Sequence, residues 1–234
     1  MIVDLVTRAV QDAETANAES IPKAAELVLA SLRADGLVFS AGAGHSLAAV
    51  AETFYRAGGL ASVYPLYHPE LLPLHGARAS TRTERRSGLA AEVLAERAPG
   101  PDDVLVVFSN SGVNPYPVEL AHAARAAGAP VIAVSSRVSV AAAPKRAAST
   151  LIEEADIVLD TGVRPGDASF PPENPRTAAL STVLNAFLWN AVLARLVSTA
   201  DFEVPLWRSA NVPGGDEANA SLHARYLPRI PQLA

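Results

Sequence analysis

The chain has 234 residues, half of them apolar, a formal net charge of -5 and no cysteine. A chain of this length buries roughly 70% of its unfolded surface, so it needs no metal or disulfide to fold, and the absence of cysteine excludes thiol chemistry. Its scattered Lys and Arg residues form no basic stripe, which argues against nucleic acid as a partner.

The first 35 residues predict a helical arm. Apolar residues recur at helical spacing over 3–18 and again over 21–34. Asp4, Arg8 and Asp12 interrupt the apolar core that a secretion signal needs, and no apolar run in the chain reaches the roughly 20 residues of a membrane span. We therefore expect a cytoplasmic protein without a membrane partner.

From residue 37 onward, short β-rich runs alternate with helical stretches. The strands are expected at 37–41, 61–66, 103–109, 130–136 and 156–160, and the helices at 46–57, 83–97, 116–127 and 177–199. Near-continuous apolar strands separated by helices are typical of a parallel sheet covered on both faces. The sequence predicts an α/β, three-layer α-β-α sandwich with five parallel strands at 36–200, preceded by the helical arm at 1–35 and followed by a tail at 201–234.

Three of the strand ends share the same small, polar residues. The segments are GAGHS at 42–46, SNSGVN at 109–114 and SSRVS at 135–139. Ligands of such sheets lie beyond the carboxyl ends of the strands, where free N–H groups and serine hydroxyls favour an anion. Ser and Gly are also ordinary turn and cap residues, but three such loops at one edge favour a phosphate site.

The common nucleotide-binding and metal-binding motifs are missing. A dinucleotide fingerprint needs a third glycine, where this chain has Leu47, and an acid at the end of the next strand, where 61–66 has none. No Gly-Lys-Ser/Thr of a Walker A loop is present, and no two histidines have the spacing of a metal site on a helix. We expect neither a cofactor nor a metal.

GAGHS and VVFSNSGVN resemble the two loops, Gly-x-Gly-x-Ser and Ser-x-Ser-Gly, that characterise the SIS (sugar isomerase) family of phosphosugar proteins. FYRAGG, SNSGVNPYPVELA and SANVPGGDE further resemble a stand-alone bacterial subgroup, whose members are uncharacterised SIS proteins or are named as phosphoheptose isomerases. The resemblance covers most of the chain. It implies a flavodoxin-like SIS fold, a sugar 6-phosphate as ligand, and a homodimer with active sites near the subunit interface.

The same resemblance implies where the ligand lies. It assigns the phosphate to Ser109, Ser111, Gly112 and Asn114, and it places Gly44, Ser46, Ser135 and Ser136 near the sugar. His45 and Asn110 of the same loops are further candidates for binding the substrate. Asn110 stands where many members have threonine. The closing motif implies that Asn211 and Asp216 lie over an active site, which can be the partner subunit's.

SIS enzymes move a proton beside a carbonyl group, and this step needs a base with a tuned pKa. Related enzymes carry a glutamate on the helix after the first loop, where this chain has Arg56, and Glu52 lies one turn earlier. Glu84 is the best counterpart of the second glutamate of the N-acetylmuramic acid 6-phosphate etherases, and His75 is the next candidate in the same stretch. Alternatively, Glu52 is a solvated helix acid and Glu84 a first-turn partner of the helix dipole. Asp167 in the long loop is one more candidate.

These residues favour a phosphosugar enzyme that needs no cofactor. Because the Glu84 region resembles the etherases, we expect C2 proton abstraction with elimination at C3 of an amino-sugar 6-phosphate, such as N-acetylglucosamine 6-phosphate. Reprotonation at C1 would instead give aldose-ketose isomerisation, as in phosphoheptose isomerases. A non-catalytic sugar-phosphate sensor is a further alternative, although the acidic first 35 residues do not resemble the basic helix-turn-helix of such regulators.

Overall fold

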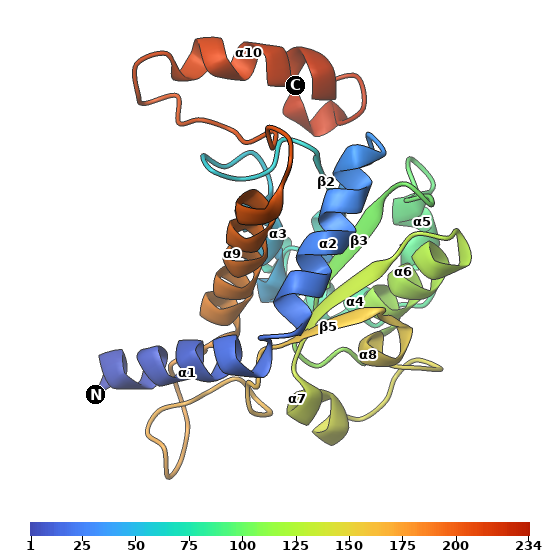
Figure 1. Ribbon diagram of the computed structural model, residues 1–234. Coiled ribbons are helices and arrows are strands. Elements are labelled where there is room, and N and C mark those ends of the chain that lie inside the picture. The colour runs from blue at the N-terminus through green and yellow to red at the C-terminus, as the bar shows by residue number, and fades with distance from the viewer.

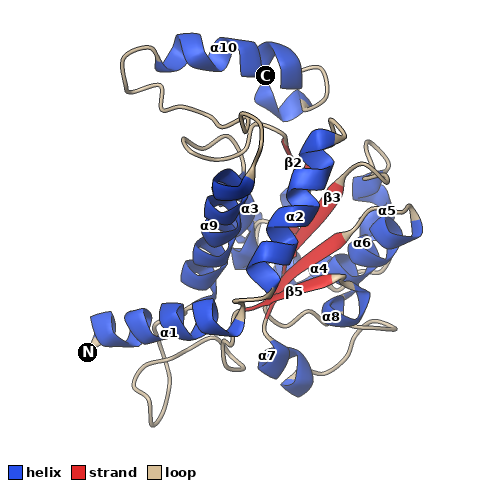
Figure 2. Cartoon of the chain, in the orientation of Figure 1, coloured by secondary structure: helices blue, strands red, loops and turns tan.

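Five short strands form a parallel sheet, in the order β2-β1-β3-β4-β5, in the computed structural model, which describes residues 1–234 (Figure 2). The strands are β1 (Val38–Gly42), β2 (Val63–Leu66), β3 (Val104–Phe108), β4 (Val131–Ser135) and β5 (Ile157–Asp160). In the central register, Val106 of β3 pairs with Ser40 of β1 and with Ile132 of β4. Every residue of β1, β3 and β4 is buried, because helices cover both faces, and this explains their continuous apolar runs.

Helices cover the two faces of the sheet and complete three layers (Figure 1). One face carries α2 (Ser20–Arg33), α3 (Leu47–Thr53) and α9 (Ser181–Thr199), and the other carries α4 (Ala77–Glu84), α5 (Leu89–Leu94), α6 (Pro115–Ala126) and α8 (Leu151–Glu154). α7 (Arg137–Ala142) follows β4, and short 3-10 turns occur at Gly44–Ser46, Pro69–Leu71, Pro73–His75 and Pro231–Leu233. The predicted α/β sandwich with a five-stranded parallel sheet is confirmed.

The long helix α9 buries one of its faces in the protein and leaves the other exposed. It packs against α2, and it buries Leu188 and Trp189 almost completely. Neither α9 nor any other helix combines the length and the apolar character that crossing a bilayer requires.

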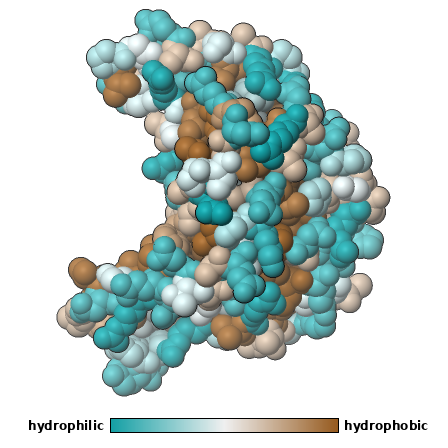
Figure 3. All heavy atoms as spheres, viewed as in Figure 1, coloured by the Kyte–Doolittle hydropathy of each residue, from teal (hydrophilic) through white to brown (hydrophobic).

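Two helices project from one side of the molecule and leave a hollow between them (Figures 1 and 3). They are α1 (Ile2–Ala16) at one end and α10 (Gly215–Tyr226) at the other. Ion pairs of 2.7 and 3.3 Å to Asp35 hold α10 through its residue Arg225 and through Arg229, which follows the helix. Since Asp35 shortly precedes β1, α10 lies at the amino edge of the sheet.

The structure differs most from the predicted elements at 83–97 and in the tail. In addition, the helix expected at 46–57 ends at Thr53, the helix expected at 177–199 begins at Ser181, and α7 and α8 were not predicted. The helix expected at 83–97 is divided into α4 and α5, because Gly88 between them has a left-handed φ of 86°. The tail contains α10, which its weak apolar periodicity did not indicate. Hydrogen bonds to another part of the chain hold this segment: the Asn219 side chain accepts from the N–H of Arg208 and donates to its carbonyl, both at 2.9 Å.

Candidate functional site

A cavity of about 460 Å³ lies at the carboxyl edge of the sheet, beyond the ends of β1, β3 and β4. In a doubly wound sheet with this strand order, ligands bind near the point between β1 and β3 where the order reverses. The cavity is lined by His45, Ser46, Glu84, Ser109, Asn110, Ser111, Ser139, residues 142–144, residues 165–167 and Ser181. It therefore joins predicted residues from four separate segments: the turn after β1, the loop after β3, the end of α4 and the long loop that carries Asp167.

The loop after β3 carries main-chain donors without a partner in the protein. They are the N–H groups of Asn110, Ser111, Val113 and Asn114. Gly112 turns the loop with a φ of 55°, and a Cβ there would lie 3.1 Å from Val140. Unpaired N–H groups in such a loop favour an anion.

The loop itself, rather than the helix that follows, supplies these donors. Pro115 and Pro117 remove two of the N–H groups in the first turn of α6. No lysine or arginine lines the cavity, and its titratable side chains are His45, Glu84 and Asp167. An anion bound here would rest on neutral N–H and hydroxyl groups.

Glu84 lines the cavity as the last residue of α4, not as the first residue of a helix. A first-turn dipole partner is therefore ruled out, since the C-terminal end of a helix disfavours an anion. Burial raises the pKa of the Glu84 carboxyl, and the amide of Asn114 and the guanidinium groups of Arg85 and Arg146 offset part of that rise. A carboxyl group with a raised pKa in a cavity is suited to exchange protons with a ligand.

Both ends of the side-chain amide of Asn110, a residue that lines the cavity, are held by hydrogen bonds. Its Oδ1 accepts from Thr161 Oγ1 at 3.0 Å, and its Nδ2 donates to Ser139 Oγ at 3.3 Å. The Ser139 and Ser136 hydroxyls both donate to the Val163 carbonyl, at 2.7 and 2.6 Å. Asn110 thus links the segments after β3, β4 and β5. A threonine at this position, as many family members have, carries a single hydroxyl and is too short to make both bonds.

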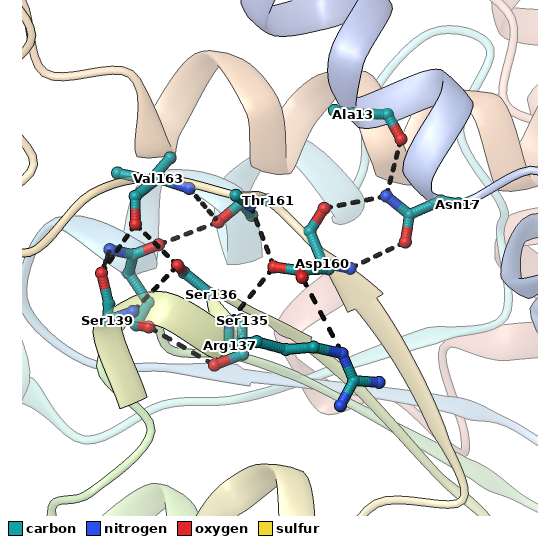
Figure 4. Close-up of polar contacts among 11 residues, drawn as sticks. Ala13, Asn17, Ser135, Ser136, Arg137, Ser139, Asp160, Thr161 and Val163 are labelled. Carbon is teal, nitrogen blue, oxygen red and sulfur yellow. Dashed lines mark hydrogen bonds and ion pairs between the residues drawn. The ribbon is translucent and has the colours of Figure 1, made fainter. Parts of the chain in front are cut away.

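The same end of β5 is bonded to the N-terminal helices (Figure 4). The side chain of Asn17, between α1 and α2, accepts from the N–H of Asp160 at 2.7 Å and donates to its carbonyl at 2.8 Å. The Asp160 carboxylate accepts from the N–H groups of Arg137 and Gly162, at 3.1 and 3.0 Å. The position of α1 is therefore linked to the strand end that carries Thr161.

Some predicted ligand residues do not line the cavity. Ser135 and Ser136 are fully buried, and their hydroxyls donate to main-chain carbonyls. Gly44 adjoins His45 with a left-handed φ of 58°, which suits glycine. Asn114 is not a lining residue, and its side-chain Oδ1 accepts from Nη1 of Arg146, a residue of another loop, at 3.2 Å.

The other predicted residues lie farther from the cavity. His75 is exposed, and its Nδ1 lies 3.1 Å from the Pro69 carbonyl. Glu52 is bonded to Asn190 of α9 at 3.1 Å and is also paired with Arg56. Asn211 and Asp216 are exposed in the tail, at the amino edge of the sheet, so they take no part in the cavity of their own chain.

Asp167 lines the cavity, but its carboxylate is already occupied. It accepts from the N–H groups of Leu180 and Ser181, at 3.0 and 2.9 Å, and from the Ser181 hydroxyl at 2.6 Å. Asp167 therefore caps the N-terminus of α9 and fixes the cavity wall. Ser181 was not predicted, because no local motif marks a serine that reaches the cavity from the far side of the long loop.

A second cavity, of about 490 Å³, lies between α1 and the segment after β5. Its lining includes Arg8 and Arg164 together with three carboxylates, those of Asp4, Asp12 and Asp160. It contains none of the predicted ligand or catalytic residues and none of the unpaired loop donors. The cavity at the strand ends is therefore the candidate site, although it is slightly smaller. No three His, Asp or Glu side chains in the chain are grouped closely enough to hold a metal ion.

The chain is similar to known proteins in sequence and in fold. Residues 3–136 match the SIS domain family. A UPF0309 protein from Brucella anthropi is 40% identical over 222 residues, which are 92% of this chain and 90% of that protein. A phosphoheptose isomerase from Neisseria gonorrhoeae matches 84% of this chain and 95% of its own, with 24% identity and a TM-score of 0.54. The sugar isomerase domain of an RpiR transcription factor from Sphaerobacter thermophilus matches 98% of this chain and 99% of its own, with 15% identity and a TM-score of 0.51. The two solved structures share the fold of this chain. The resemblance to SIS proteins that the sequence predicted is confirmed. The chain belongs to the SIS domain family and, within it, to the UPF0309 proteins.

Proposed function

We propose that the protein binds a sugar 6-phosphate in this cavity and acts on it as an enzyme without a cofactor. The phosphate lies on the unpaired N–H groups of the loop after β3, with the hydroxyls of Ser109 and Ser111 nearby. The sugar extends toward His45 and Ser46. One observation carries the assignment: Glu84, a carboxyl group with a raised pKa, lines the same cavity as the anion-binding loop.

The reaction we favour starts at C2 of an amino-sugar 6-phosphate such as N-acetylglucosamine 6-phosphate. In the open-chain form, the C1 carbonyl acidifies the hydrogen on C2, and the Glu84 carboxylate removes it as a proton. The electrons of the C2–H bond form an enolate. The enolate then expels the C3 hydroxyl, to which Glu84 returns the proton, and the products are water and a C2–C3 double bond conjugated with C1.

Two other functions share parts of this site. Isomerisation is the second candidate, because the fold is that of a phosphoheptose isomerase and because the first step, loss of the C2 proton, is the same. A sensor is the third, because the fold is also that of the ligand domain of an RpiR transcription factor. A sensor, however, has no use for a carboxyl group with a raised pKa.

The functional unit we propose is a homodimer that closes the hollow between α1 and α10, where Figure 3 shows apolar surface. α1 buries only Ala13 completely, and Ile2 and Val3 are 47% and 75% exposed. On α9, Val183 and Val197 are 41% and 48% exposed along one face. A second copy of the chain would cover these side chains. Since α9 begins at Ser181 in the cavity wall, such an interface lies near the site.

Proton NMR in D2O tests the reaction, with N-acetylglucosamine 6-phosphate as substrate and ultraviolet absorbance followed in parallel. We expect the C2 proton signal to disappear and an unsaturated absorbance to grow with the wild type, but not with Glu84→Gln. Exchange at C2 without absorbance would favour isomerisation. Binding without exchange would favour the sensor. If the protein shows no binding and no exchange, an amino-sugar phosphate is refuted as its ligand.

A further inference from the structure

Helix α9 is poor in charge on both of its faces. Of its 19 residues only Arg195 is charged. One face is buried through residues such as Leu184 and Leu188, where α2 and α3 pack against the helix. An outer helix face that remains in water carries charged and polar side chains, whereas a helix that is apolar all round is covered on all sides. The outer face of α9 therefore has the composition of a covered surface, although nothing in the single chain covers it.

The outer face carries a straight stripe of five residues, which we call the α9 seam. They follow one another at intervals of four, three, four and three: Val183, Phe187, Asn190, Ala194 and Val197. The average interval is 3.5 residues, the repeat that aligns side chains along the contact between two packed helices. Phe187 is partly buried, and the other four residues are exposed. The α9 seam thus has the pattern of a helix that packs against a second helix.

The α9 seam is complementary to itself when a second copy of α9 runs in the opposite direction. Asn190 is its middle residue, so a two-fold axis at this position places Asn190 opposite its own copy. Val183 then meets Val197 of the partner subunit, and Phe187, the largest residue of the seam, meets Ala194, the smallest. In a parallel pair, two Phe187 rings would meet in one layer and two Ala194 methyl groups in another. Since facing layers pack best when large residues meet small ones, the antiparallel pair fits better.

We propose that two copies of the chain pair through the α9 seam, with antiparallel α9 helices and the two-fold axis at Asn190, an arrangement that rests on the homodimer proposed above but not on the proposed reaction. The Asn190 side chain is held in place at the middle of the seam, because its Nδ2 donates to the Ala186 carbonyl at 2.9 Å and to Glu52 Oε1 at 3.1 Å. A single polar residue in an apolar seam lowers the stability of the pair but selects the register in which it meets itself.

The antiparallel pair also determines which edges of the two sheets lie side by side. α9 begins at Ser181 in the cavity wall, at the carboxyl edge. Beyond its other end the chain is bonded at the amino edge, where the N–H of Ala61 donates to the Pro205 carbonyl at 2.8 Å. Reversing the second helix sets the amino edge of one chain beside the carboxyl edge of the other. α10, which projects from the amino edge (Figure 1), then extends toward the edge of the partner at which the candidate cavity lies.

Engineered cysteines test this geometry without background, because the chain contains none of its own. A disulfide between two chains requires Cα atoms within about 7 Å of each other. Under mild oxidation we expect Asn190→Cys to form a disulfide-linked dimer by itself. Val183→Cys and Val197→Cys should each stay unlinked alone and form a linked dimer only after the two proteins are mixed and exchange subunits. Ala126→Cys is the matched control, since Ala126 is exposed on α6 at the opposite face of the sheet, and it should stay unlinked.

The pattern of links separates the possible arrangements. A linked dimer of Val183→Cys alone or of Val197→Cys alone would indicate a parallel pair and overturn the inference. A dimer in light scattering that forms no link in any variant or mixture would also overturn it, and the homodimer of the proposed function would then use another surface. A monomer in light scattering would overturn both the seam and the homodimer.

The polar centre of the seam gives an independent test. Asn190→Leu should lower the dissociation constant of the dimer, because an apolar residue then replaces a polar one in the contact. A dissociation constant that rises would overturn the placement of Asn190 at the centre of the pair. C2 exchange is measured separately: links in the expected pattern without any exchange would leave the seam standing and refute the proposed reaction.

Discussion

Replacing Glu84 by Gln should make the protein more stable and less active at the same time. Burial raises the pKa of Glu84 in the folded state above the 4.5 of an unperturbed glutamate. The folded chain therefore holds this proton more tightly than the unfolded chain does. The stability that comes from the proton is fully present below the unfolded pKa and is lost as the pH rises through the folded pKa. At neutral pH the buried carboxylate thus lowers the free energy of unfolding. Glutamine, a neutral side chain of the same shape, does not have this effect.

The size of the effect follows from how far the two pKa values are separated. Each pH unit of separation corresponds to about 1.4 kcal/mol. For a chain of 234 residues this is a rise in Tm of roughly 3 to 6 °C per pH unit. Thermal unfolding at neutral pH and at about pH 4 measures it, and the difference between the variant and the wild type should shrink at the lower pH, where Glu84 is protonated in both states.

The same substitution should slow C2 exchange by about 10²- to 10⁴-fold, as expected when a general base is lost, with sugar-phosphate affinity little changed. Glu92→Gln is the control, because Glu92 is an exposed acid on the neighbouring helix α5, paired with Arg86 at 2.8 Å. A Glu84→Gln protein that is less stable than the wild type at neutral pH would refute the burial argument. One that exchanges C2 within tenfold of the wild-type rate would refute the role of Glu84 as base.

Three further substitutions test the hydrogen bonds around the cavity and the proposed dimer interface. Asn110→Ala removes both amide bonds at the base of the cavity, and we expect chemical denaturation to show a loss of about 1 to 3 kcal/mol together with weaker phosphate binding; unchanged stability would contradict this linking role. Asp167→Ala removes the cap of α9 and should cost about 1 to 2 kcal/mol in the same assay, whereas a neutral outcome would mean that the cap is dispensable. Val183→Glu should shift the proposed dimer toward monomer in light scattering, while Ala126→Glu on the opposite face should not, and equal behaviour of the two would contradict the proposed interface.

Most of the fold was readable from local sequence. The runs around Val38, Val104 and Val131 are apolar on both faces, which only a buried parallel strand requires, and the predicted strands agree with β1 to β5 within a few residues. The polar loops were found for the same reason, since strand ends of a parallel sheet meet at one edge. Part of each of the three loops lines the cavity, and the third contributes Ser139.

The features of the site that could not be predicted from the sequence depend on contacts between segments that are distant along the chain. Glu84 was expected at a helix start, but the break at Gly88 makes it a helix end, and only the structure shows that it lines the cavity. The bonds of Asn110 to Thr161 and of Arg146 to Asn114 join separate loops, so no local pattern announces them. Ser135 and Ser136 were predicted from the family pattern as ligand residues, but in this structure their hydroxyls donate to main-chain carbonyls and so stabilise the fold.

Amide NMR during addition of N-acetylglucosamine 6-phosphate is the most direct test of where the ligand binds. We expect the largest shifts at the N–H groups of Asn110, Ser111, Val113 and Asn114, with little effect from the sugar without its phosphate. Shifts that cluster instead around Arg8 and the segment after β5, at the second cavity, would contradict the assignment of the site.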